Sequence, residues 1–215
     1  MIAFSGLDGA GKSTQIKLLT KVYEEKSTKN LVFWSRGGYS PGMKFLKNIL
    51  KISKQTSKKE GEIRVNLREK SFSNPLVRKI WLSVSMLDLI LFYGFYLRLK
   101  ELFGTKVICD RYIYDTVLDF RLNFPDEEIE KWMLWRLLLL LSVKPKKHFV
   151  ITIPVKESLR RSKLKNEPFP DSIEVLESRL NKYLKYVSVN KDAIHIDGTG
   201  KIDNIHFNIL KELNT

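Results

Sequence analysis

The stretch FSGLDGAGKST, residues 4–14, carries three glycines and a lysine directly after a short apolar run. Within it, residues 6–13 match the phosphate-loop pattern G-x-x-x-x-G-K-[ST]. Glycines allow a tight turn whose N–H groups point inward at an anion, and the following helix adds the positive end of its dipole. In such a loop Lys12 contacts phosphates and the Ser13 hydroxyl binds Mg²⁺. A plain turn between two elements is the alternative, but the strand before and the amphipathic helix after favour the phosphate loop.

Short apolar runs and helical stretches alternate along the rest of the chain. The runs lack polar alternation, as expected of strands covered on both faces. They lie at residues 1–4, 31–34, 106–109, 148–153 and 193–196. Helical periodicity is clearest at 12–26 and in the C-terminal stretch at 202–213. This alternation predicts an α/β fold of the P-loop type, with a doubly wound, parallel five-stranded sheet and one domain over residues 1–215.

Composition sets broader limits. The net charge of +14 favours an anionic partner, such as a nucleotide, a nucleic acid or an acidic membrane surface, but equally suits a lysine-rich surface in water. The single cysteine, Cys109, excludes an internal disulfide and fits a reducing, cytoplasmic location. We expect no signal peptide before the loop. The most apolar segment, residues 132–143, contains Arg136 and is shorter than the ~20 residues that a bilayer span needs.

A second polar cluster ends the third predicted strand, in VICDRYIYDT at residues 107–116. An acid in that position, here Asp110, can hold Mg²⁺ through water or assist the attacking oxygen. The neighbouring Arg111 can hold a phosphate by two parallel hydrogen bonds. A salt-bridged strand end is the alternative for this tripeptide alone. Combined with the loop, the cluster predicts the second half of one site.

In GLDGAGKST and CDRY the chain resembles the thymidylate kinases, a family of P-loop nucleoside monophosphate kinases, and the resemblance covers most of the chain. It implies that the third strand lies next to the first, so that Asp110 and Arg111 reach the loop. It implies ATP and Mg²⁺ as cofactors and dTMP as the phosphate acceptor. The substrate-binding residues implied are Asp8, Arg36 in WSRGGYSPG, Asp88, Arg111 and Tyr112.

The resemblance also implies which residues surround ATP. The loop contributes Gly6, Asp8, Gly9, Ala10, Gly11, Lys12, Ser13 and Thr14, and Mg²⁺ lies near Ser13 and Asp110, in part through water. TIPVKESLRRSKLK resembles the strand that leads into the family's short basic lid, at about 156–171, and IHIDGTG resembles the final strand and adenine loop. The catalytic residues expected are Lys12, Asp110, Arg111, Arg161 and Lys165.

Arg161 and Lys165 are included among the catalytic residues because of the composition of the phosphate loop. It has no arginine at its variable positions, so the lid is expected to supply the catalytic cation. Arg161 and Lys165 are four residues apart and share a helix face, with Arg160 and Lys163 as the second choice.

The family's base-reading elements match this chain less well. The helix before CDRY reads SMLDL at 85–89, so Asp88 matches the family's acid, while Leu89 replaces an arginine and Ser85 an aromatic residue. Trp81, one turn earlier, is the nearest aromatic. A buried base edge that loses its donor costs ~1–3 kcal/mol in discrimination. The acceptor therefore stays open between dTMP, another nucleotide, a nucleoside and another small molecule.

Aromatic residues that could stack on a base, or simply pack in the core, are Tyr39, Tyr93, Phe95 and Tyr96. A guanine switch is disfavoured because the nearest string to N-K-x-D is NKDA, which ends in Ala193. A non-catalytic nucleic-acid-binding protein is the alternative from another class, motivated by charge but without a recognisable binding signature. The family is commonly dimeric, so we expect a homodimer and no membrane partner.

Overall fold

The computed structural model describes residues 1–35, 72, 74–165 and 171–214. Five strands form one parallel sheet in the order β2-β3-β1-β4-β5. The bounds are β1 Ile2–Gly6, β2 Asn30–Trp34, β3 Lys106–Asp110, β4 Lys147–Thr152 and β5 Ala193–Asp197. All five predicted strands are confirmed, with ends that agree to within two residues. The sheet order and the flanking helices give the P-loop nucleotide-kinase type of α/β fold.

The strand order decides which loops meet. β1 is central and fully buried, and it lies between β3 and β4. Phe4 of β1 is in register with Asp110 of β3, so the third strand in sequence is next to the first, as the resemblance implied. Parallel strands end at the same edge of the sheet, so the loop after β1 and the residues after β3 are neighbours.

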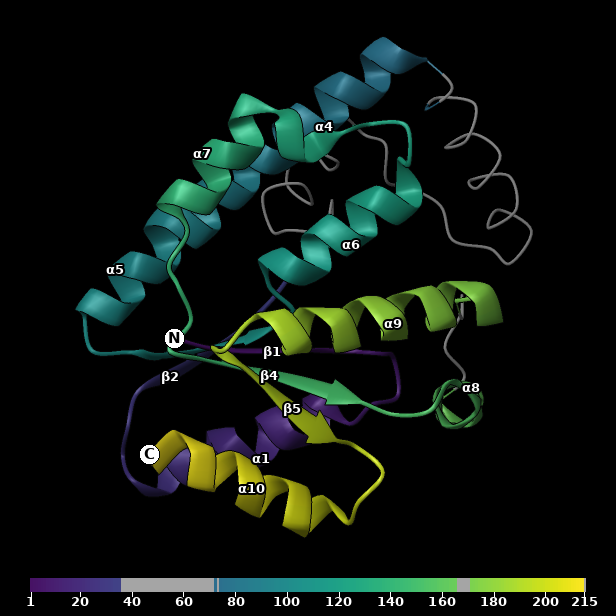
Figure 1. Cartoon of the computed structure of the whole chain (residues 1–215). Helices are drawn as coiled ribbons and strands as arrows, with labels where there is room; N and C mark the ends of the chain where they lie inside the picture. The colour runs from purple at the N-terminus through teal and green to yellow at the C-terminus, as the bar shows by residue number, and fades with distance from the viewer. Residues whose placement is uncertain (36–71, 73, 166–170, 215) are drawn as a thin grey trace, which may run out of the picture.

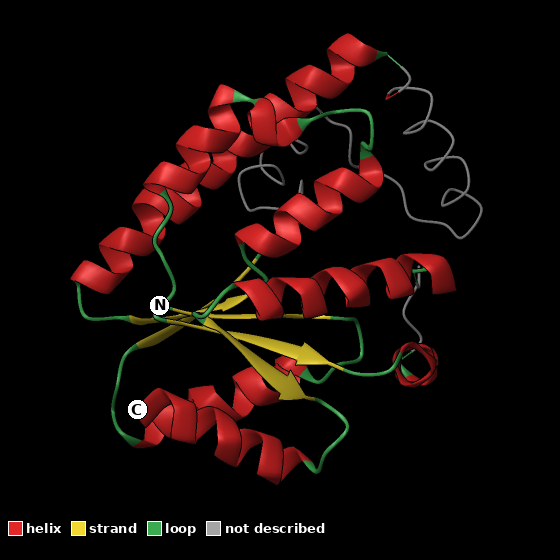
Figure 2. Cartoon of the chain, in the orientation of Figure 1, coloured by secondary structure: helices red, strands yellow, loops and turns green. Residues whose placement is uncertain are grey.

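Helices cover both faces of the sheet (Figures 1 and 2). On one face lie α1 and α10; on the other lie α4, η1, α5, α6, α7 and α9, and α8 stands beyond the carboxyl end of β4. Their bounds are α1 Lys12–Glu25, α4 Pro75–Leu89, π-helix η1 Ile90–Tyr96, α5 Leu97–Leu102, α6 Ile113–Asn123, 3₁₀-helix η2 Ile129–Lys131, α7 Met133–Leu141, α8 Val155–Leu164, α9 Ile173–Val189 and α10 Ile202–Asn214.

Apolar side chains fix both layers. Ile16 and Leu19 of α1 and Ile209 of α10 are buried beneath the sheet, as their helical spacing predicts. Above the sheet, Tyr93 is fully buried and packs on Tyr112, with ring centroids 4.4 Å apart. Tyr93 is therefore a core residue. Among the other stacking candidates, Phe95 and Tyr96 are exposed on η1, and Tyr39 lies outside the described residues.

The longest apolar helical stretch is formed by α4, η1 and α5 together. Pro75–Leu102 is 28 residues long, and by length and composition it is the one helix among the described residues that meets the criteria for a membrane span. Half of its most apolar window is buried inside the protein, as in a core helix. The segment at 132–143, singled out from sequence as the most apolar, forms the shorter α7, which buries Trp135 and Leu138.

Gly6 offers a direct test of this sheet geometry. Its φ is +141°, and a Cβ atom there would lie 2.0 Å from the backbone oxygen of Ile151. We predict that Gly6→Ala lowers the free energy of unfolding in urea by more than ~3 kcal/mol, because the new Cβ would overlap with backbone atoms of β4 and not with the end of a flexible side chain. Gly104, with φ +75° and nothing within 4 Å of its Cβ position, is the matched control. Gly104→Ala should cost only ~1–2 kcal/mol, and equal losses for the two variants would contradict the close β1–β4 contact.

Candidate active site

The phosphate-loop residues connect β1 to α1. Gly9 has φ +77°, which a glycine adopts without strain, and Gly11 caps α1. The Lys12 ammonium is buried and donates to the carbonyl oxygens of Gly6 at 2.9 Å and Leu7 at 2.8 Å. Burial, together with the neighbouring Arg111 cation, lowers the pKa of Lys12 to about 8. The Lys12 ammonium therefore lies inside the loop and close to the Arg111 guanidinium, which follows β3.

Ser13 and Asp110 lie together at the end of β3. The Ser13 hydroxyl is 3.4 Å from Oδ2 of Asp110. The other oxygen, Oδ1, is buried and has no hydrogen-bond partner among the described residues. A hydroxyl beside a carboxylate with an unused oxygen suits Mg²⁺, which prefers oxygen ligands and keeps several waters. In the described part of the chain, no group of three His, Cys, Asp or Glu residues is arranged to hold a metal.

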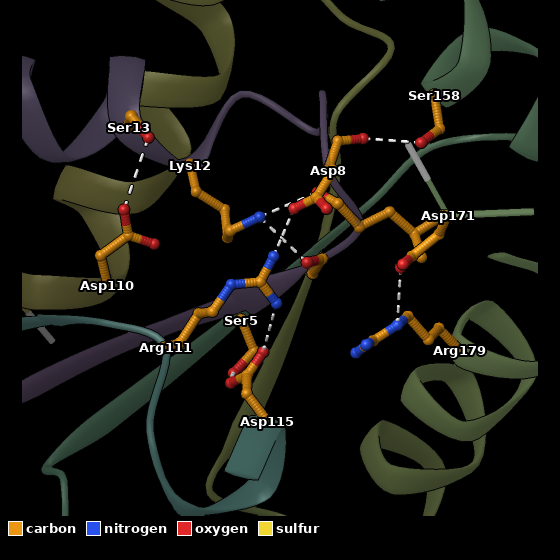
Figure 3. Close-up of polar contacts among 12 residues, drawn as sticks. Ser5, Asp8, Lys12, Ser13, Asp110, Arg111, Asp115, Ser158, Asp171 and Arg179 are labelled. Carbon is orange, nitrogen blue, oxygen red and sulfur yellow. Dashed lines mark hydrogen bonds and ion pairs between the residues drawn. The ribbon is translucent and has the colours of Figure 1, made fainter. Parts of the chain in front are cut away.

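Arg111 joins the loop to the segment after β3 (Figure 3). Its φ is +74°, in the left-handed region, and its N–H donates to the Phe4 carbonyl at 2.8 Å. One terminal nitrogen, Nη2, pairs with Asp8 of the loop, and the other, Nη1, lies 3.3 Å from Oδ1 of Asp115. Burial alone would lower the pKa of Arg111, but Tyr183, Asp115 and Asp8 raise it. The two motifs found in the sequence are thus brought into one site.

Asp115 is a site residue that sequence reasoning missed. Its carboxylate is 1 % exposed, and four donors surround it. Oδ1 accepts from Tyr183 and Arg111, and Oδ2 accepts from the Ser5 hydroxyl and from the Tyr112 N–H at 3.2 Å. The available signal was its spacing of four residues from Arg111 at the start of a helix, which favours an ion pair.

The same network continues through His148. The Ser5 hydroxyl donates a hydrogen bond to Asp115, so the Ser5 oxygen accepts a hydrogen bond from Nε2 of His148, 2.7 Å away. Nδ1 of the neutral ring then accepts from the Tyr186 hydroxyl at 3.0 Å. Burial lowers the pKa of His148. His148 is therefore a structural residue of β4 that holds Ser5 in place, and through Ser5 the Asp115 carboxylate.

Helix α8, expected to begin the lid, packs against the loop. Ser158 donates to the Asp8 carbonyl at 2.6 Å. Nη1 of Arg161 lies 3.2 Å from the carbonyl oxygens of both Gly9 and Gly198, and its Nε pairs with Glu157. Arg161 thus connects the phosphate loop to the loop after β5.

The other lid cations lie further out. Lys165 is exposed at the end of α8, and Lys163 is also exposed. Arg160 is exposed and pairs with Glu157 at 2.7 Å. The structure therefore brings Arg161, but not Arg160, onto the phosphate loop. The lid beyond Lys165 and up to residue 170 lies outside the described residues.

A cavity of about 330 Å³ opens beside the loop. Three segments enclose it: the loop with the first turn of α1, the end of α8, and the loop that leads from β5 into α10. It reaches the expected adenine loop IHIDGTG through Gly198 and Gly200. Its lining residues are Gly9, Ala10, Gly11, Thr14, Gln15, Arg161, Leu164, Lys165, Gly198, Gly200, Ile202 and Ile205.

Of the residues predicted to bind the phosphate acceptor, the structure describes some but not all. Asp88 is buried in α4, and Tyr112 is buried with its hydroxyl donating to the Val143 carbonyl at 2.5 Å. Trp81 packs against Phe72 and Phe124 in an aromatic cluster. Arg36 lies outside the described residues. Tyr112 is thus anchored in the core beside Arg111.

Comparison with known proteins gives full-length similarity at low identity. No model of a protein family matches the sequence. A thymidylate kinase from Thermosipho africanus is 29 % identical over 209 residues, which cover 95 % of this chain and 92 % of the relative. A probable thymidylate kinase from Pyrococcus horikoshii is 27 % identical over 97 % of this chain and 93 % of its own length. A thymidylate kinase from Fervidobacterium nodosum is 26 % identical over 99 % and 98 %. These similarities support a relationship to that family.

The neutral His148 predicts how stability depends on pH. Its pKa in the folded chain lies below the ordinary value of ~6.5, so the unfolded chain binds the extra proton as pH falls below about 6.5. The free energy of unfolding should then decrease with falling pH, by up to ~1.4 kcal/mol per unit from this residue. In His148→Gln, urea denaturation between pH 8 and 5 should show a correspondingly shallower decline. An unchanged slope would contradict a buried neutral ring.

Proposed function

We propose that this protein is an ATP-dependent nucleotide kinase that phosphorylates a nucleoside monophosphate, with dTMP as the first acceptor to test. The observation that carries the proposal is the convergence of Lys12, Asp110 and Arg111 at one edge of the sheet, where Arg111 is bonded to the loop itself. The similarity to thymidylate kinases over nearly the whole chain supports it.

The site residues divide the work of phosphoryl transfer by position. The transferred group needs positioning and positive charge rather than covalent chemistry. In this proposal Lys12 and the loop N–H groups bind the phosphates of ATP, whose base and sugar lie toward the cavity beside Gly198. Arg111 faces the acceptor phosphate, with Asp8 and Arg36 on the acceptor side. Mg²⁺, held by Ser13 and Asp110, would neutralise phosphate charge.

The lid would act by closing the site. In the proposed single domain, 1–215, the segment at about 156–171 covers the phosphates and excludes water, so that transfer goes to the acceptor. Arg161 is the best-placed lid cation, because its guanidinium already lies on the loop carbonyl of Gly9. If the Arg161 guanidinium exchanged the Gly9 carbonyl for a phosphate oxygen, its positive charge would lie next to the transferred phosphoryl group. Lys165 lines the same cavity from the end of α8.

A different acceptor on the same scaffold is the second candidate. Leu89 is 1 % exposed and Ser85 is also buried, so the positions where the family has an arginine and an aromatic residue offer neither a guanidinium nor a ring for a pyrimidine. Trp81 is engaged with Phe72 and Phe124. Another nucleotide, a nucleoside or another small molecule would then replace dTMP.

An acceptor panel tests both candidates. Purified protein, ATP and Mg²⁺ are assayed for ADP release with each common nucleoside monophosphate, with nucleosides, and without acceptor. We expect release that depends on a nucleoside monophosphate and is lost at least ~10³-fold in Lys12→Met, as expected for loss of a phosphate-binding charge. Turnover with a nucleoside and not with a nucleoside monophosphate would move the proposal to the second candidate. No acceptor-dependent release from any compound would exclude both.

The pKa of Lys12 predicts a pH profile. Because Lys12 loses its proton as pH rises through about 8, free enzyme binds ATP less well above that pH. kcat/KM for ATP, which reports groups of the free enzyme, should fall by up to ~10-fold per unit between pH 8 and 9.5. kcat should begin to fall only at a higher pH than kcat/KM does, because the bound phosphate stabilises the protonated form of Lys12. A kcat/KM that stays flat to pH 9.5 would contradict the role of Lys12.

A homodimer in the cytoplasm is the proposed state of the protein. The long helix formed by α4, η1 and α5 carries a row of exposed apolar side chains, and a second copy would cover them. The row consists of Ile80, Leu87, Leu91, Phe95, Leu99 and Leu102. Light scattering at micromolar concentration should give twice the mass of one chain. In Leu91→Lys the measured mass should fall to that of a single chain. A monomer in the unaltered protein would contradict this assembly.

A further inference from the structure

We propose that Asp115 is a positioning residue that fixes the Arg111 guanidinium while the opposite end of that guanidinium exchanges its partner during the reaction. The inference rests on the proposed phosphoryl transfer, since it assigns Arg111 to the acceptor phosphate. Asp115 itself does not reach the substrate in this account; it acts only through Arg111.

The two ends of Arg111 have different surroundings. Nη2 pairs with Asp8, a loop residue whose side chain is 27 % exposed, whereas Nη1 pairs with Asp115, whose side chain is 1 % exposed. An acceptor phosphate arriving at the loop can therefore compete with Asp8 for one end. The Asp115 end is out of reach, so it would hold the guanidinium in place during the exchange.

Asp115 is itself held rigidly, which a positioning residue requires. Tyr183 of α9 donates to it at 2.7 Å, the Ser5 hydroxyl of β1 donates to it, and the backbone N–H of Tyr112 donates at 3.2 Å. Two other elements, α9 and β1, and the N-cap of α6 therefore fix one carboxylate, which stands in the first turn of α6, where the helix dipole also favours it. Behind Ser5, His148 completes the network.

The backbone of Arg111 gives an independent reason for such an anchor. Its φ of +74° is costly for a residue with a side chain, and such strain persists only where surrounding contacts over-determine it. The N–H bond to Phe4 fixes the main chain, and the ion pairs fix the side chain. Without Asp115, the partly exposed Asp8 would be the remaining carboxylate paired with the guanidinium among the residues that the structure describes.

Asp119 supplies a matched control one turn further along α6. It is 2 % exposed and pairs with Arg179 at 2.6 Å, so it is also a buried carboxylate paired with an arginine. Arg179 in turn lies 3.0 Å from Asp171, at the far side of the site from Arg111 (Figure 3). Asp115→Asn and Asp119→Asn therefore each remove the charge of a buried carboxylate that is paired with an arginine. Only Asp115 contacts Arg111, on which Asp119 acts through its more distant charge alone.

The first experiment observes Arg111 directly. Nitrogen-15 NMR of the arginine side chains, assigned with Arg111→Lys, should show two separate Nη signals for Arg111, because both ends are held. In Asp115→Asn these signals should merge as the guanidinium rotates, and in Asp119→Asn they should stay separate. Merged signals in the unaltered protein, or no difference between the variants, would overturn the inference, whether or not the protein proves to be a kinase.

The second experiment measures turnover with the best acceptor. Asp115→Asn should lower kcat about 30-fold or more, as misplacement of a charge at the transferred group predicts, with KM for ATP within twofold. In the Arg111→Lys background it should add less than threefold, since Asp115 acts through Arg111. Asp119→Asn should lose similar thermal stability yet keep kcat within threefold. Equal kcat losses for the two asparagine variants would reduce Asp115 to a structural role.

Tyr183→Phe keeps the test possible if Asp115→Asn does not fold. It removes one donor from Asp115 and leaves both charges, so kcat should fall about 3- to 10-fold, again without a change in KM for ATP. An unchanged kcat in Tyr183→Phe would count against the inference. Absence of turnover in the unaltered protein would instead refute the proposed function and leave the NMR result to decide on Asp115.

Discussion

The Arg111 guanidinium is the contact through which the phosphate loop, the third strand and helix α6 become one site. It bonds Asp8 in the loop and Asp115 in α6, while its own N–H extends the pairing of β3 with β1. The contacts with Asp8 and with the Phe4 carbonyl would not form if β3 lay elsewhere in the sheet. The order β2-β3-β1-β4-β5 is therefore the constraint on which the proposed chemistry depends.

Charge balance explains why this site can stay folded with two buried cations. Lys12 and Arg111 lie beside the carboxylates of Asp8, Asp110 and Asp115, and Lys12 also donates to loop carbonyls. Isolated buried charges would be far more costly. The same pairing leaves the site able to bind phosphate, because phosphate oxygens can replace the loop carbonyls and the Asp8 carboxylate as partners of the two cations. A cation that is already desolvated gains more from such an exchange than one in water.

Much of this arrangement could be predicted from sequence. The five strands are continuous apolar runs, and the loop pattern fixes Lys12 and Ser13 by spacing alone. The ion pair of Arg111 with Asp8 could not be predicted, because it joins residues 103 positions apart. The pair with Asp115 was indicated only by a spacing of four residues. The contacts of Ser5 and His148 depend on sheet register, which joins residues 143 positions apart. Likewise, Tyr93 was a stacking candidate until tertiary packing placed it in the core.

The most direct test of the central claim is calorimetric binding of one compound in which adenosine and thymidine are joined by five phosphates. If Lys12 and Arg111 serve one pocket for two nucleotides, the compound should bind once per chain and about 100-fold more tightly than ATP, as expected when two ligands are linked. Lys12→Met and Arg111→Met should each remove most of that affinity. Binding no tighter than that of ATP, together with indifference to Arg111→Met, would contradict the account.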